Sequence, residues 1–221
     1  MKTYALTIVA FIFLTVPVSS WAEKAQDEKV KTFACFRDDW VKTEGKESFH
    51  SQEFLVHWTW KKIGAGINVV TVPKKDFILV KPFATFKIAD GPIFLVGGPM
   101  TTSSSDYLHG GIWIITKLNQ FDVFIDLREY VEISGGENSD YLDFFWEITY
   151  PILNKYSLGV AGFYDYWWQD NGHDQLLIGP VGLYHFSETS SFFIRPSYDW
   201  ESQKGETKRT AKVRAGMRFI F

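Results

Sequence analysis

Strict two-residue alternation at the C-terminus is the feature that most restricts how this chain can fold. One side of the segment is apolar and carries Val213, Ala215, Met217, Phe219 and Phe221. The other side carries Lys212, Arg214, Gly216 and Arg218. Successive side chains of a strand point to opposite faces, whereas a helix would mix the two sets around its surface. Residues 207–221 are therefore predicted to form a strand with one apolar and one charged face.

The same alternation recurs along most of the chain. Twelve segments are predicted as strands: 33–40, 52–60, 63–72, 76–88, 92–99, 109–117, 121–134, 141–152, 157–168, 174–186, 191–200 and 207–221. Ten strands are the alternative if 33–40 and one neighbour do not span. Short connections at 118–120, 154–155 and 187–189 alternate with longer ones at 101–106, 135–140, 169–173 and 202–206. This regularity is typical of a membrane barrel with short turns at one end and longer loops at the other.

The composition fits strands with one lipid-facing and one water-facing side. Aromatic residues make up 18% of the chain, yet its mean hydropathy is −0.10. Beyond the N-terminus no apolar run approaches the roughly 18 residues that a spanning helix needs. A soluble β-sandwich is the competing interpretation, but it gives no reason for alternating connection lengths. The chain holds a single cysteine, Cys35, so no intramolecular disulfide can form.

The N-terminus predicts export. A basic start at Lys2 precedes an apolar run over residues 4–18, and Ser20 and Ala22 supply the small residues of a cleavage site. We therefore expect a signal peptide over 1–22, a periplasmic lead over 23–32 and a barrel over 33–221. A retained anchor helix is the alternative, but the run is shorter than the roughly 20 residues of a span. The mature chain would be acidic, which argues against nucleic acid as a partner.

The last residue adds a resemblance to a known class of proteins. The chain ends on the aromatic Phe221, with Phe219 and Met217 at the preceding alternate positions. This ending resembles the C-terminal assembly signal of bacterial outer-membrane β-barrel proteins. The resemblance implies an all-β fold, a single closed antiparallel transmembrane β-barrel in the outer membrane of a Gram-negative cell. It also implies that both termini are periplasmic and that the partners include outer-membrane lipids and the barrel-assembly machinery.

The charged faces are assigned to the lumen, because Arg or Lys on the lipid face at mid-depth costs about 2–4 kcal/mol. A basic wall is predicted from Arg195, Lys212, Arg214 and Arg218, which His57 and Lys61 join across the barrel closure. An acidic wall on the other side is predicted from Asp122, Asp126, Glu132, Asp143, Glu147 and Asp165. Interfacial aromatic girdles are expected near the two strand ends: Trp58, Trp60, Tyr150, Tyr156 and Tyr184 at one, and Tyr107, Tyr141, Trp167, Trp168, Tyr198 and Trp200 at the other.

The function predicted from these walls is a small diffusion channel or porin. A transverse field between the walls would orient small polar solutes during passage. Size and topology are similar to those of small monomeric porins, although no motif ties the chain to one family, and the solute is not specified. No enzyme activity or cofactor is predicted. No metal site is predicted either, because the five histidines show no paired spacing on one face.

Two alternatives remain open. His185 and Ser187 resemble the His-x-Ser arrangement of outer-membrane lipid hydrolases, although Glu188 stands where an Asn would be expected. The second alternative is a non-conducting structural or surface barrel whose interior is filled with salt-bridged side chains.

Overall fold

The computed structural model describes residues 30–43, 47–134, 140–168, 174–203 and 206–221. The predicted signal peptide and residues 23–29 of the predicted lead lie outside this part of the chain. Within the described ranges, no helix is long and apolar enough to span a membrane.

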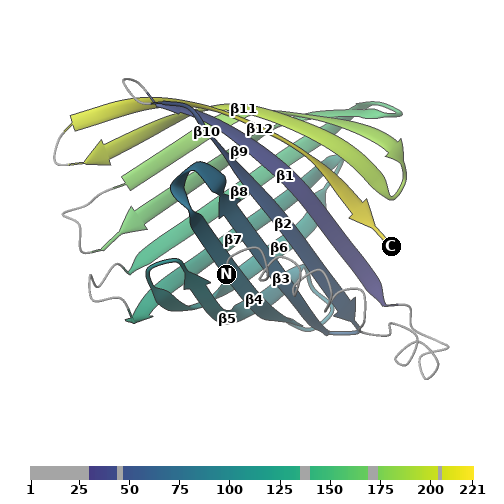
Figure 1. Ribbon diagram of the computed structural model, residues 1–221. Coiled ribbons are helices and arrows are strands. Elements are labelled where there is room, and N and C mark those ends of the chain that lie inside the picture. The colour runs from purple at the N-terminus through teal and green to yellow at the C-terminus, as the bar shows by residue number, and fades with distance from the viewer. Residues whose placement is uncertain (1–29, 44–46, 135–139, 169–173, 204–205) are drawn as a thin grey trace. The chain divides into compact units, whose positions relative to one another are not determined.

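Twelve antiparallel strands, each hydrogen-bonded to its sequence neighbours, form one closed barrel (Figure 1). They are β1 (Lys31–Thr43), β2 (Phe49–Trp60), β3 (Ile63–Val72), β4 (Phe77–Lys87), β5 (Ile93–Thr102), β6 (Asp106–Leu118), β7 (Phe121–Ser134), β8 (Tyr141–Leu153), β9 (Tyr156–Trp167), β10 (Asp174–Ser187), β11 (Ser190–Gln203) and β12 (Glu206–Ile220). A 3-10 turn, η1 (Pro73–Lys75), lies between β3 and β4. The predicted fold class and strand number are confirmed, and ten strands are excluded.

The two ends of the barrel differ in how the strands are joined. At the end that carries the start of β1 and the end of β12, which we call the turn end, four connections have only two residues: 61–62, 119–120, 154–155 and 188–189. Lys61 and Asn119 open two of these turns with φ of 54° and 56°, the left-handed backbone that tight hairpins require. At the opposite, loop end, connections at 44–48, 135–140 and 168–173 are longer. The loop predicted at 202–206 is shorter than expected, because the ladder continues to Gln203–Glu206.

The first and last strands close the barrel without a break. Their ladder runs from Phe33–Ile220 to Thr43–Thr210. Thr32 and Phe221 exchange two further backbone hydrogen bonds of 2.9 and 2.8 Å at the turn end. Closure leaves the barrel without a first or last strand edge, as a lipid environment requires of a β-structure.

The outward face is apolar around the barrel. Large hydrophobic side chains exposed on it include Phe36, Phe54, Leu95, Leu108, Val131, Ile148, Leu158, Ile178, Ile194 and Met217. Met217, Phe219 and Phe221, the predicted assembly signal, share this face, and the last two rings stack 6.2 Å apart. Buried charged groups lie on the other face, among them Asp39, Arg128, Glu147 and Arg195. An apolar outward face and a charged inward face are the reverse of the arrangement in a water-soluble protein. This arrangement fits a barrel surrounded by lipid.

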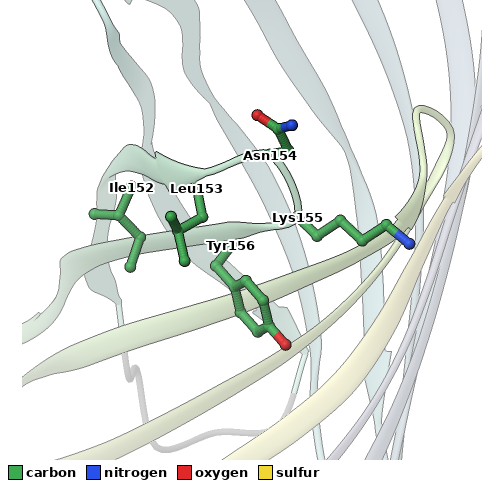
Figure 2. A pocket seen from close by; sticks show the side chains of 5 residues that line it. All are labelled: Ile152, Leu153, Asn154, Lys155 and Tyr156. Carbon is green, nitrogen blue, oxygen red and sulfur yellow. The ribbon is translucent and has the colours of Figure 1, made fainter.

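Aromatic rings gather on the outward face at the turn end. Tyr156 and Tyr184 lie 5.1 Å apart, and Tyr150 lies 5.2 Å from Phe121. Beside the β8–β9 turn, Ile152, Leu153, Asn154, Lys155 and Tyr156 line a shallow hollow, with Lys155 extended away from the apolar side chains (Figure 2). Leu153 is 66% exposed there. Apolar and aromatic groups beside a lysine suit the interface between acyl chains and headgroups.

The girdle predicted at the loop end needs correction. Tyr107, Tyr141 and Trp167 face the barrel interior, because their strand parity places them beside the buried Tyr130. The rings of Tyr130 and Tyr141 stack 4.4 Å apart. Closeness to a strand end does not make an aromatic residue interfacial when alternation points its ring inward. The side chain of Trp200 lies outside the described part of the structure.

Candidate functional site in the barrel interior

The register of the twelve ladders assigns every strand's inward face. Directly paired residues share a face, so Arg214 lies on the same side of the wall as Arg195 on β11 and Asp39 on β1. All ten predicted lumen residues fall on this inward face: Asp122, Asp126 and Glu132 on β7, Asp143 and Glu147 on β8, Asp165 on β9, Arg195 on β11, and Lys212, Arg214 and Arg218 on β12.

Glu147 is the centre of a group of three charged side chains in the interior. Arg195 donates to its Oε2, and Arg218 donates to Oε1 and Oε2 at 2.9 and 3.0 Å. Glu147 and Arg195 are both almost fully buried, at 5% and 3% exposure. Glu147 stands on β8 and the two arginines on β11 and β12, so this group joins the predicted acidic and basic walls to each other.

The basic wall also contains carboxylates that the sequence analysis missed. Arg214 donates to both oxygens of Asp39, at 2.6 and 2.5 Å. Arg37 forms an ion pair with Glu53, and Asn68 donates to the same carboxylate at 2.8 Å. Asp39 and Glu53 lie on β1 and β2, where adjacent charged residues such as Arg37-Asp38-Asp39 hide the alternation that would have assigned their faces.

Two cations that the sequence analysis did not assign lie in or against the acidic wall. Arg128 donates to both oxygens of Asp126 at 2.7 Å. Lys81, on β4, reaches across the interior and donates to the hydroxyl oxygen of Tyr130 on β7 at 2.8 Å. The Arg128–Asp126 pair reduces the net field between the walls, because each charge is partly neutralised by its partner. The Tyr130 hydroxyl is a neutral acceptor, so Lys81 adds a positive charge to the acidic wall.

Aromatic rings fill the space between the ion pairs. The Arg195 guanidinium lies 5.0 Å from the Phe145 ring, and that of Arg218 lies 4.7 Å from Phe193. Arg128 lies 5.1 Å from the ring of Trp113. Two buried apolar clusters surround these contacts, one containing Cys35, Ala161, Val181, Leu183 and Phe193 and the other Phe83, Val96 and Trp113; Leu55 packs against both. Much of the interior is therefore closed by side chains.

Water reaches one side of the interior more readily than the other. The side chains of Arg37 and Arg218 are 28% and 25% exposed, and that of Arg214 is 14% exposed. Arg195 and Arg128 are only 3% and 5% exposed. Since all five face inward, this exposure opens to the lumen. We call the region around Arg37, Arg214 and Arg218 the wet side, and the region around Arg195, Glu147, Arg128 and Tyr130 the packed side.

The remaining residues proposed for the basic wall have other surroundings. His57 lies inside, but its Nε2 is 2.9 Å from Thr85 Oγ1 and its ring packs edge-on against Trp113. Lys61 lies in the β2–β3 turn with its ammonium group 5.3 Å from the Trp60 ring. Among the described residues, no group of three or more His, Cys, Asp or Glu is arranged to hold a metal ion.

The two residues of the hydrolase alternative are not hydrogen-bonded to each other. His185 Nε2 lies 3.0 Å from Ser157 Oγ on the neighbouring strand, whereas Ser187 Oγ lies 3.3 Å from Thr189 Oγ1 in the turn. A bulge between His185 and Ser187 shifts the register there. A nucleophile needs a base within hydrogen-bond reach, and this geometry gives Ser187 none from His185.

A closed antiparallel barrel with an apolar outer surface and a charged interior is the architecture of outer-membrane barrels, and it places the chain in that class. No family model matches the sequence, and no curated protein matches it.

The chain is similar to solved structures in its three-dimensional fold. A KdgM porin superimposes with a TM-score of 0.57 at 11% identity, covering 85% of this chain and 99% of that one. The KdgM porin in complex with disordered oligogalacturonate gives 0.58 at 12% identity, with the same coverage of both chains. The NanC porin gives 0.55 at 14% identity, covering 84% of this chain and 98% of that one. At these identities the likeness concerns the fold.

Proposed function

We propose that this barrel is a narrow diffusion channel for small polar solutes, with its passage along the wet side of the interior. The observation that carries the proposal is the exposure of Arg37 and Arg218, at 28% and 25%, on a face that points into the barrel. Space that water can enter beside fixed charges is what a polar solute needs to cross an apolar membrane.

The strand number supports a passage of limited width. Eight strands enclose an interior that side chains just fill, whereas 16–18 strands leave a wide aqueous channel. Twelve strands lie between these cases. On the packed side, the Glu147 group and the aromatic rings fill the interior volume. On the wet side, part of that volume remains open to water. We therefore expect small solutes to pass and large ones to be excluded.

A planar-bilayer experiment tests the proposal. We expect discrete conductance steps from the purified, refolded chain. An Arg37→Glu variant reverses a charge on the wet side, so the reversal potential in a salt gradient should move toward cation preference. Glu129→Lys, on the exposed outward face of β7, is the matched control and should leave the reversal potential unchanged. Absence of steps above the lipid background, in protein with heat-modifiable mobility, would contradict the channel.

We also propose that the turn end lies on the periplasmic side, with both termini there, and that Met217, Phe219 and Phe221 act as the assembly signal. Deleting Phe221 should lower the amount of folded protein in the outer membrane while leaving total synthesis unchanged. Fractionation with an immunoblot measures both quantities. A Phe36→Ala variant, which changes an outward aromatic residue of β1, is the control.

A further inference from the structure

In the described strands, two ladders are interrupted without a shift of register, and each interruption is centred on facing prolines. Between β4 and β5 the pairing stops after Val80–Thr101 and resumes at Ala84–Gly97 without a shift of register. Pro82 and Pro99 therefore stand opposite each other in the gap. Neither has an N–H, so the hydrogen bonds that would join the strands at this point are missing.

The second gap repeats the first. Between β10 and β11 the pairing stops after Ile178–Tyr198 and resumes at Gly182–Ile194, again without a register shift, so Pro180 faces Pro196. All four prolines are exposed on the outward face. We call these two gaps the proline seams.

Each seam also contains a glycine directly before one of its prolines. Gly98 and Gly179 directly precede Pro99 and Pro180, and at each glycine a Cβ atom would collide with the carbonyl oxygen of the opposite proline, Pro82 or Pro196. On their other edges the same strands remain paired. Pro82 pairs with Ile67 of β3, and Pro196 pairs with Val213 of β12. The two gaps therefore contain the same residue types in the same arrangement, a proline facing a Gly-Pro pair.

The seams lie on opposite sides of the barrel. Six strands, β5 to β10, separate them in one direction, and six, β11 through β12 and β1 to β4, separate them in the other. In Figure 1, β4 and β5 lie at the bottom of the barrel and β10 and β11 at the top. Two opposed gaps in the ladders, each flanked on both sides by paired residues, thus lie between two sets of six strands.

A cation precedes one proline of each seam and ties that seam to the same region of wall. Lys81, before Pro82, reaches Tyr130 on β7, and Arg195, before Pro196, reaches Glu147 on β8. Each contact spans three strands along the wall. One polar contact from each seam therefore crosses the interior to the β7–β8 region, where Glu147 also receives Arg218 of β12.

We propose that the proline seams are hinges along which the two six-strand halves flex, and that Lys81–Tyr130 and Arg195–Glu147 are the latches of the narrow state. Hinges act where few bonds resist a change of backbone angle, and packed elements on either side then move as units. The hinge stands on the wall geometry alone; only its consequence, control of passage, rests on the proposed channel.

Distances between spin labels on the two halves test the hinge. Labels replace Phe36 on β1 and Val131 on β7, both outward-facing, in a Cys35→Ala background. The distance distribution should be broad in the otherwise unchanged chain. It should narrow about twofold when Pro82, Pro99, Pro180 and Pro196 are all changed to Val, because the new N–H groups restore the ladders. Equal widths in the two proteins would overturn the hinge.

Controls separate the hinge from general loosening. Labels at Leu108 on β6 and Val160 on β9, within one half, should give a narrow distribution that the four changes leave unaltered. Pro151→Val, outside both seams, should not narrow the Phe36–Val131 distribution. If the fourfold variant does not fold, the Pro82→Val/Pro99→Val pair serves in its place and should give a smaller narrowing in the same direction.

Two further measurements address the latches and the channel separately. Lys81→Met should broaden the distribution, and an unchanged width would remove this latch. In bilayers, switching between conductance levels should become at least tenfold rarer in the fourfold proline variant. If no current is found in any variant, the proposed channel fails while the label distances still decide the hinge.

Discussion

The packed and wet sides of the interior contain the same kinds of residue and differ in what surrounds them. On the packed side, Arg195 pairs with Glu147 and is 3% exposed; on the wet side, Arg37 pairs with Glu53 and is 28% exposed. An ion pair enclosed by Phe145 and Phe193 is expected to matter for stability, because breaking it leaves a charge without water. In the Arg37–Glu53 pair the carboxylate is buried but water reaches the guanidinium, so we expect a smaller contribution to stability and a cation that a passing solute can contact.

The largest expected effect comes from removing the centre of the packed side. Glu147→Leu leaves Arg195 and Arg218 without their shared carboxylate, and we expect a loss of about 3–5 kcal/mol in the free energy of unfolding. Denaturant titration in lipid vesicles measures it. Asp122→Leu, which breaks the exposed pair with Lys117 at 3.3 Å, is the control. If both variants lost the same free energy of unfolding, the buried ion pairs of the packed side would contribute no more to stability than an exposed pair.

A matched pair of arginine variants compares the two sides directly. Arg195→Met should lower the free energy of unfolding by about 2–3 kcal/mol, less than Glu147→Leu because Arg218 still neutralises the carboxylate. Arg37→Met should lower it by about 1–2 kcal/mol and should also change conductance, because buried Glu53 keeps the Asn68 donor and water reaches the vacated position. The same titration and bilayer recordings give both readings. If Arg37→Met lowered the free energy of unfolding more than Arg195→Met does, the region around Arg37 would be the packed side.

Tyr130→Phe tests the Lys81 contact without changing a charge. Lys81 loses the acceptor that lies 2.8 Å away, and the expected loss of stability is about 1–2 kcal/mol. The ring stacking of Tyr130 on Tyr141 is retained in this variant. Tyr150→Phe, on the outward face, should change stability by less than about 0.5 kcal/mol.

The smallest change in the free energy of unfolding is expected for an ion pair at the turn end. The side chains of Lys117 and Asp122 are 61% and 58% exposed, so Lys117→Ala should change the free energy of unfolding by less than about 1 kcal/mol. Raising the salt concentration should remove even this difference, because exposed charges are screened. A loss above 2 kcal/mol would show that the turn end is more enclosed than these exposures indicate.

The fold could be predicted nearly in full because alternation is a local property. The bounds predicted for 63–72 and 121–134 coincide with β3 and β7, and most other segments differ by a few residues. In β1 and β2 the prediction began late, at 33 and 52 rather than at Lys31 and Phe49, because Lys31-Thr32 and Phe49-His50-Ser51 show no alternation of apolar and polar residues. Strand ends are uncertain where polarity no longer distinguishes the faces.

The candidate site was predictable only in its orientation. The ten charges assigned to the lumen on β7 to β12 lie on the inward face, because side-chain parity follows from the sequence, whereas Lys61 lies in a turn. Which charges meet was not predictable, because Glu147 and Arg195 are 48 residues apart, and Asp39 and Arg214 are 175 apart. The expectation of two separate walls missed the carboxylates of β1 and β2 and the cations Lys81 and Arg128.

The sequence by itself determined a closed barrel with its charges inside, because a period of two and the high free energy of charge in lipid leave few other arrangements. Only the tertiary structure decided which side of the interior is packed and which is wet. It also decided that Pro82 faces Pro99 and Pro180 faces Pro196 on opposite sides of the barrel. The physical reason is that pairing between strands depends on register and closure, which join residues far apart in the chain.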